Sequence, residues 1–223
     1  MKRLFSLLLV IVLLFSITAC NDDSEDGNDV TPGCSHVWVA ATCTEAKTCS
    51  KCNETQGSAL GHTTDSGICS RCGENFSAWE IGEYNDEFDM PSGVKYIITD
   101  SYGTFSNSAT SNSTLYAAVQ IDQEDIGIML WEYGSMLVKG IYDYENYSIT
   151  ILDENGTKHY FTGTIYQGST RVYFKYNDRA SVISLLQNND SLKIYLKTSK
   201  YSVSTYLFEI DTKGFSFAYN QII

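Results

Sequence analysis

The 223-residue chain contains little proline, little histidine and an excess of acidic over basic residues. Its two prolines exclude a collagen-like or proline-rich linker protein. It has 15 lysines and arginines against 27 aspartates and glutamates, and because the net charge of −12 repels phosphate, we expect no nucleic acid among its partners. Apolar residues are plentiful, at 43% hydrophobic and 13% aromatic, so the chain can bury a core and is not wholly disordered.

Residues 77–223 also lack the usual groups of a catalytic site. They contain no cysteine and a single histidine, His159, and neither a Gly-x-Ser-x-Gly elbow nor a glycine-rich phosphate loop occurs. Since a general base needs positioned partners, we interpret His159 as a surface residue. Acidic residues gather at 86–89 and 122–125, which we interpret as solvated turns. The sequence therefore favours a non-enzymatic protein; the alternative is a hydrolase of envelope glycans that uses these loop carboxylates across a cleft.

Residues 1–19 have the pattern of a secretory signal peptide. Two basic residues precede an almost wholly apolar run, Leu4 to Ile17, which is shorter than the roughly 20 residues of a membrane span. Ile17-Thr18-Ala19-Cys20 resembles a bacterial lipobox, which implies that Cys20 is acylated, with palmitate among its lipids, and becomes the mature N-terminus. We therefore expect a lipoprotein anchored in the cell membrane and exposed on its extracytoplasmic side; a plain signal peptide or a single membrane span are the alternatives.

Residues 20–33 are interpreted as the lipidated cysteine and an acidic tether. Five acidic residues lie among Asn, Ser, Gly and Pro with one Val, so no apolar face can form and the segment stays solvated. The acidic run directly after Cys20 also resembles the surface-export signal of some Bacteroidetes lipoproteins. The sequence thus predicts a spacer between the membrane and the folded part.

Residues 34–76 form a module that is rich in metal-ligating side chains and poor in apolar ones. These side chains are Cys34, His36, Cys43, Cys49, Cys52, His62, Cys69 and Cys72. The two Cys-x2-Cys pairs are separated by sixteen residues, a zinc-ribbon spacing, and His-x6-Cys occurs twice. Asn53 and Gly73 follow the pairs, where a residue with positive φ suits a tight turn. Because so small an apolar core cannot stabilise a fold by itself, we expect one or two structural zinc ions to cross-link the segment.

The spacing leaves the pairing of the ligands open. One option is a first site of Cys49, Cys52, Cys69 and Cys72 and a second of Cys34, His36, Cys43 and His62. The other is a first site of His36, Cys43, Cys49 and Cys52 and a second of His62, Cys69, Cys72 and Cys34. Disulfides are an alternative, since an exported chain meets an oxidising compartment, as is one zinc ion with a Cys34–Cys43 bond. A lipoprotein that captures zinc would need a partly open, exchangeable site, whereas thiolate-rich sets are usually closed.

Residues 34–62 resemble a Cys/His repeat of exported proteins from Gram-positive bacteria. That repeat runs C/G-x-H-x-W, A-T-C-T, C-x-x-C-G and L-G-H, and the chain matches it at 34–38, 41–44, 49–52 and 60–62. Asn53 replaces the usual glycine, and a shortened second unit at 61–73 lacks the A-T-C-T part. The resemblance implies zinc and an extracellular setting, implies no enzymatic activity and does not extend to residues 77–223.

Residues 77–223 predict a β-rich domain that contains all 16 tyrosines. Alternating or β-branched runs predict strands at 96–99, 113–122, 126–133, 136–142, 147–153, 158–166, 171–176, 192–197 and 202–210. Asp153-Glu154-Asn155-Gly156 predicts a hairpin turn with positive φ at both of its last two residues. A helix is expected at 178–188 with Asp178 as its cap, and 215–223 is ambiguous between strand and helix.

The expected fold is therefore mainly β: a small zinc-ribbon-like module followed by an antiparallel β-sandwich or barrel with one or two short helices. We interpret 103–115 as a polar loop and 77–93 as a partly ordered acidic link. The tyrosine-rich strands suggest a domain that binds an envelope protein or glycan.

Overall fold

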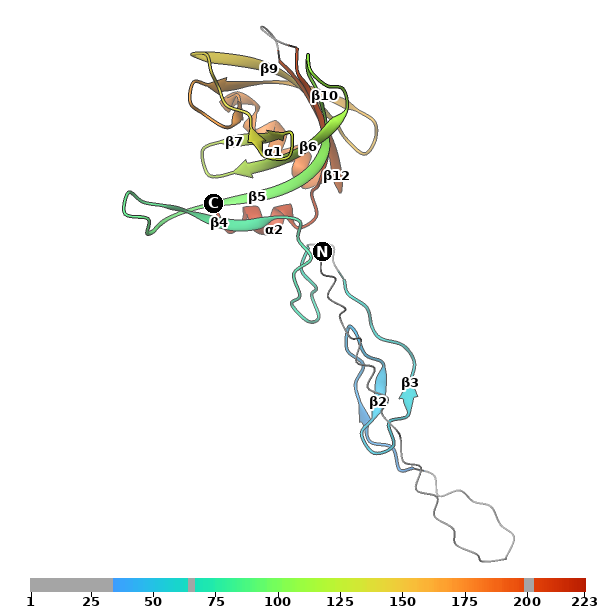
Figure 1. The fold of residues 1–223 in the computed structure, drawn as a ribbon. Helices are drawn as coiled ribbons and strands as arrows, with labels where there is room; N and C mark the ends of the chain where they lie inside the picture. The colour runs from blue at the N-terminus through green and yellow to red at the C-terminus, as the bar shows by residue number, and fades with distance from the viewer. Residues whose placement is uncertain (1–33, 64–66, 199–202) are drawn as a thin grey trace, which may run out of the picture.

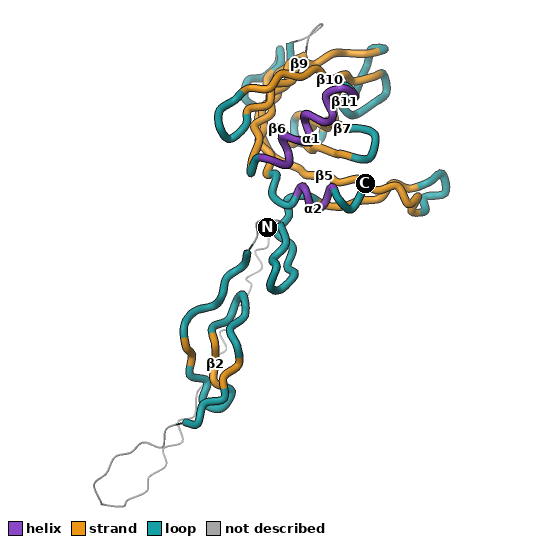
Figure 2. The backbone as a smooth tube through the Cα atoms, turned by 180° about the vertical axis from the view of Figure 1, so that it is seen from behind, coloured by secondary structure: helices purple, strands orange, loops and turns teal. Residues whose placement is uncertain are grey.

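The computed structural model describes residues 34–63, 67–198 and 203–223 (Figure 1). The expected signal peptide, lipidated Cys20 and acidic tether lie outside the described residues. No helix within the described ranges combines the length and the apolar character needed to cross a membrane. Two bodies of structure follow one another along the chain, a slender Cys/His module and a larger β domain (Figures 1 and 2).

The β domain is a closed antiparallel barrel, so the predicted mainly β fold is confirmed and the barrel is realised rather than the sandwich. In order around the ring its strands are β5 (Pro91–Ser106), β6 (Ser113–Ile121), β7 (Ile126–Glu132), β11 (Val172–Phe174), β10 (Lys158–Tyr166), β9 (Tyr144–Leu152), β12 (Ser191–Thr198) and β13 (Thr205–Asp211). The short strand β11 closes the ring, because Val172 pairs with Ile128 of β7 while β11 also pairs with β10. Closure removes the exposed edges that an open sheet would leave.

Period-two alternation explains why these strands form a barrel with a filled interior. On β12, Leu192, Ile194 and Leu196 are buried, whereas Lys193 and Tyr195 between them face solvent. Each fully buried Leu or Ile contributes about 1.5–3 kcal/mol relative to an exposed one, so the register that points them inward is strongly favoured.

Two helices add to the barrel core. Helix α1 (Arg179–Asn188) follows the single 3-10 turn η1 (Tyr176–Asp178) and buries Val182, Ile183 and Leu186. It lies across the ring of strands, and α2 (Phe215–Tyr219) lies beside β5 (Figure 2). Asp178 occupies the N-cap position of α1, as predicted, but its side chain makes no cap hydrogen bond, because the residue already has helical φ and ψ within the 3-10 turn. The ambiguous segment 215–223 begins as a helix.

Sequence-based expectations for three segments differ in part from the structure. Residues 77–93, expected as a partly ordered link, are ordered as part of the barrel domain, because Trp79 is buried in the core and β4 (Glu80–Asn85) pairs with β5. The polar loop expected at 103–115 is shorter, because β5 runs to Ser106 and β6 begins at Ser113, with Phe105 and Leu115 buried in the core. The predicted strand 136–142 is only the two-residue β8 (Met136–Leu137).

The Cys/His module has its own three-stranded sheet of β1 (Trp38–Val39), β2 (Lys47–Cys49) and β3 (Thr55–Gln56). Its C-terminal part meets the barrel domain through glycines. A Cβ on Gly67 would overlap the backbone of Gly214 at the start of α2, and both residues have positive φ. The Ala78 N–H donates to the Lys213 carbonyl at 3.2 Å. Only glycine allows the two segments to approach this closely.

Candidate metal centre

The first cluster of ligand-type side chains surrounds the first Cys-x2-Cys turn. Its members are Cys34, His36, Cys49 and Cys52, whose ligand atoms all lie within 4.8 Å of one another. Cys49 ends β2, and its N–H donates to the Glu54 carbonyl at 2.8 Å while its own carbonyl accepts from Asn53 N–H at 2.9 Å. Asn53 has φ +57°, which confirms the expected positive φ and lets the turn place both thiols on one side.

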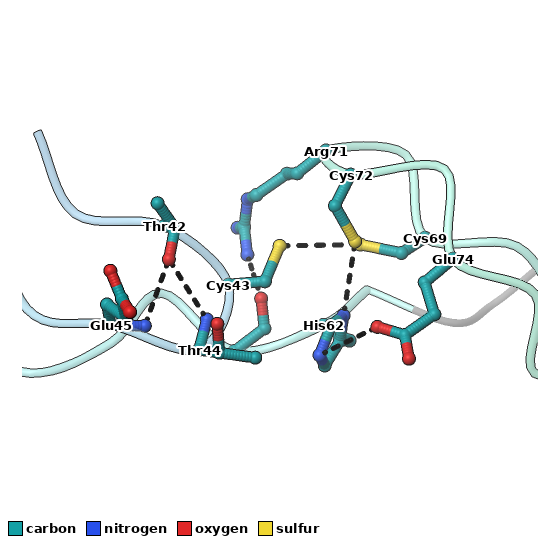
Figure 3. A network of polar contacts seen from close by, with 10 residues as sticks. Thr42, Cys43, Thr44, Glu45, His62, Cys69, Arg71, Cys72 and Glu74 are labelled. Carbon is teal, nitrogen blue, oxygen red and sulfur yellow. Dashed lines mark hydrogen bonds and ion pairs between the residues drawn. The ribbon is translucent and has the colours of Figure 1, made fainter.

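The second cluster repeats this construction around the second turn (Figure 3). Its members are Cys43, His62, Cys69 and Cys72, again within 4.8 Å. The Cys69 N–H donates to the Glu74 carbonyl at 2.8 Å, and the Cys69 carbonyl accepts from Gly73 N–H at 2.8 Å. Gly73 has φ +76°, as expected. The two clusters are thus near copies of one local structure, each with three cysteines and one histidine.

The structure brings all eight predicted ligands into these clusters, but neither pairing that the spacing left open is the one found. The sets differ from the second option by an exchange of Cys34 and Cys43. The cause is the path of the chain. Pairing of Trp38 with Cys49 holds the Cys34 segment beside the first turn. Hydrogen bonds from Leu60 N–H to the Thr42 carbonyl (2.9 Å) and from Gly61 N–H to the Cys43 carbonyl (3.1 Å) bring Cys43 alongside His62.

No disulfide joins the cysteines of the described part of the chain, all six of which are free. The Sγ atoms of Cys43 and Cys69 lie 3.7 Å apart, far beyond the roughly 2.05 Å of a disulfide. The expected alternative of a Cys34–Cys43 bond is wrong, because the two residues belong to different clusters.

The spacing of the donor atoms fits tetrahedral zinc. With Zn–S near 2.3 Å and Zn–N near 2.0–2.1 Å, a tetrahedron places two sulfurs about 3.8 Å apart and a sulfur and a nitrogen about 3.5 Å apart. Cys43 and Cys69 Sγ are 3.7 Å apart. The Nδ1 atoms of His36 and His62 each lie 3.4 Å from the Sγ of Cys52 and Cys72, respectively. Both clusters are therefore able to hold a metal ion and are compatible with zinc.

A glutamate, not among the ligand-type residues predicted from the sequence, faces the outer nitrogen of each histidine. Glu54 Oε2 lies 3.4 Å from His36 Nε2, and Glu74 Oε2 lies 3.5 Å from His62 Nε2. When Nδ1 binds a metal ion, Nε2 carries the proton and donates toward the carboxylate, the arrangement that orients metal-binding histidines and raises their basicity. The signal was present in the sequence, since both turns read Cys-x2-Cys-x-Glu.

The first cysteine of each turn sits where its thiolate is stabilised. Burial opposes ionisation of the Cys49 thiol. Hydrogen bonds from the backbone N–H groups of Lys51 and Cys52, together with other donors, have the larger effect and lower the Cys49 pKa to about 6. The N–H groups of Cys72 and Arg71 lower the Cys69 pKa to about 5. Because a metal binds thiolate rather than thiol, these turns favour binding at neutral pH.

The other candidate groups serve local structure. One oxygen of Asp86 accepts the N–H of Phe88 and of Met90, and Asp122 likewise accepts from Glu124 and Asp125, as expected for turns.

His159 is not isolated, because its Nε2 lies 2.9 Å from Asp153 Oδ2. Asp153 also accepts two N–H groups of its turn, so the pair closes a hairpin.

Comparison with models of known protein families, with curated proteins and with solved structures finds no match for this chain.

Proposed function

We propose that this chain is a lipid-anchored lipoprotein of the cell envelope, exposed on the extracytoplasmic side, in which two structural zinc ions stiffen a module that carries a non-enzymatic, partner-binding β barrel. The observation that carries the proposal is the pair of matching Cys₃His clusters, which occupy a segment with almost no other core. The lipobox pattern and the acidic tether support the anchor and the location.

The donor sets support a structural ion. Zinc bound there would cross-link chain segments that are distant in sequence and would supply folding free energy. Three cysteines and a histidine complete a tetrahedron, so no position is left for a water molecule or a substrate. The residues of this chain then act as follows: the turns present thiolates, the histidines close the sets, and Glu54 and Glu74 orient the histidines.

Closed sets also favour a structural role over zinc capture. In the described residues, the apolar side chains of 34–76 that are buried are those of Cys43, Cys49 and Cys69, which are themselves ligands. A module without an independent core folds around its metal and releases it only by unfolding. A carrier would instead need an exchangeable ion.

Two measurements on the full-length chain test this proposal. Metal analysis after purification is expected to find two zinc ions per chain, retained against a weak chelator, with six titratable thiols among 34–72 after denaturation. Labelling with a palmitate analogue in the producing cell is expected to mark the chain but not its Cys20→Ser variant. No zinc and no free thiols would replace the zinc module by a disulfide module. Rapid loss of zinc to the weak chelator would favour capture, and equal labelling of both chains would remove the lipid anchor.

A further inference from the structure

A cavity of about 230 Å³ opens at the end of the barrel away from α1. Helix α1 leads directly into the start of β12, whereas the cavity lies at Thr198, where that strand ends. Residues on several strands and on the 136–142 segment line it. Its polar lining includes Glu132, Glu145, Tyr147, Thr198, Ser204 and Tyr206. Mouths of β-barrels are common places for small ligands, and this volume suits a small one.

Tyr147 lines this cavity with a side chain whose hydroxyl has no hydrogen-bond partner among the described residues. The residue is 2% exposed, and it lines the cavity beside Tyr206, whose ring centroid is 6.4 Å away. Within the described ranges its hydroxyl makes no hydrogen bond and keeps some exposure, so it is able to bond a ligand in the cavity. Burial, reinforced by the carboxylates of Glu145 and Glu132, raises the pKa of Tyr147, so the hydroxyl keeps its proton.

Two carboxylates face the same space without a basic partner. Glu132 is held by neutral groups, because Oε1 accepts from the Tyr206 hydroxyl at 2.8 Å and Oε2 accepts from Asn107 Nδ2 at 3.2 Å. The side chain of Glu145 makes neither a hydrogen bond nor an ion pair with any described residue, and burial raises its pKa. Lys139 also lines the cavity but forms no ion pair with either carboxylate. The described lining therefore carries two carboxylates against one ammonium group, so its charge is net negative.

We propose that this cavity binds a small organic molecule through one primary ammonium or guanidinium group. An ammonium group brings three donors and no acceptor, which matches Glu145, the remaining lone pairs of Glu132 and the oxygen of Tyr147. The tyrosine rings add a favourable surface for a cation. A neutral sugar would leave Glu145 without a countercharge. The proposal rests on the binding role proposed for the barrel and names the chemistry of its ligand.

The test is calorimetric titration of the zinc-loaded full-length chain in mild detergent at pH 7. N-acetyl-lysinamide is compared with N-acetyl-norleucinamide, which lacks only the amine, and n-pentylamine with 1-pentanol. We expect each amine to bind at least about tenfold more tightly than its neutral match, the loss expected when a hydrogen-bonded charge is removed. If N-acetyl-lysinamide binds more tightly than n-pentylamine, the ligand is a lysine-like side chain on a peptide; if n-pentylamine binds more tightly, the ligand is a free amine. Equal binding of amine and neutral match, or binding of Ca²⁺ or a sugar in place of the amines, would overturn the proposal.

Variants locate the binding in the cavity. Glu145→Gln and Tyr147→Phe are each expected to weaken amine binding about tenfold, while Glu124→Gln, in the exposed β6–β7 turn at the other end of the barrel, leaves it unchanged. Tyr147→Phe removes a hydroxyl without a hydrogen bond, so its melting temperature should not fall, which separates lost binding from lost folding. If the affinity for amines is unchanged in both variants, the amine binds outside this cavity. Zinc content and Cys20 labelling are measured separately, so failure here is distinguishable from failure of the proposed lipoprotein.

Discussion

Single Cys-to-Ser substitutions test the ligand sets that the fold assembles. Cys34 and Cys49 belong to one cluster, and Cys43 and Cys69 to the other. Serine keeps the size of the side chain but removes the thiolate that a soft metal needs. Each substitution is therefore expected to remove one of the two metal ions and to leave the other bound.

The magnitude follows from how little else holds the module together. A structural zinc ion contributes about 10–16 kcal/mol of apparent binding free energy, which in such modules is folding free energy. The buried apolar side chains of the described part of 34–76 are ligands themselves, so no separate core remains when an ion is lost. Loss of the first ion should release the β1–β3 sheet. Loss of the second should release the Ile68–Asn75 bridge and the contact between Gly67 and Gly214.

The assay is ¹¹³Cd NMR of the cadmium-substituted protein, in which each cluster gives its own resonance. Cys34→Ser and Cys49→Ser are expected to remove the same resonance, and Cys43→Ser and Cys69→Ser the other one. Metal analysis should find a fall from two ions to one in all four variants.

Specific results would refute the pairing. If Cys43→Ser removed the resonance that Cys49→Ser removes, Cys43 would belong to the first turn. If Cys49→Ser and Cys69→Ser removed the same resonance, the two Cys-x2-Cys turns would share one ion. Cysteines that resist alkylation after denaturation and metal removal would indicate disulfides instead.

Three further predictions concern the glutamate beside His62, the pH dependence of stability and the packing around a glycine. The Glu74→Gln variant still binds zinc, but its affinity in chelator competition is about 10–100-fold lower, because no carboxylate faces the histidine nitrogen. Asp153→Asn lowers the free energy of unfolding in urea at pH 7 but not near pH 2. The hydrogen bonds that Asp153 accepts from His159 and from the turn lower its pKa in the folded protein. The carboxylate therefore stabilises the fold above the unfolded-state pKa of about 3.9, and this stabilisation is lost as the pH falls through the lower folded-state pKa. Gly214→Ala destabilises the domain by about 1–3 kcal/mol in thermal unfolding, since φ is +80° and the added methyl would overlap Ser77.

Matched controls accompany each variant. Glu45→Gln removes an exposed carboxylate of the module that faces no histidine and should leave zinc affinity unchanged. Asp125→Asn removes an exposed carboxylate of the β6–β7 turn and should leave the free energy of unfolding in urea at pH 7 unchanged. Gly156 also has positive φ, +81°, but open space around it, so Gly156→Ala should cost less than Gly214→Ala. Equal losses at the two glycines would contradict the overlap with Ser77.

Local sequence was sufficient for most of the features that depend on neighbours along the chain. The Cys-x2-Cys turns and the positive φ of Asn53 and Gly73 followed from spacing alone, because four or five residues close each turn. Period-two alternation located most barrel strands, since one face of each strand is buried. Even so, at the 153–156 hairpin positive φ falls on Gly156 and not on Asn155, because the Asp153 side chain accepts the N–H groups of Asn155 and Thr157 and selects another turn.

The sequence by itself determined the eight ligand-type residues, the β class of the larger domain and the lack of a recognisable catalytic motif. Only the tertiary structure decided which ligands share a cluster, because backbone pairing between distant segments carries Cys43 across to His62. It also decided where the barrel is hollow. Glu132 and Tyr206 are 74 residues apart and share a hydrogen bond only because the closed ring of strands brings them to one mouth. No local pattern encodes such a contact, since its partners meet through the register of strands between them.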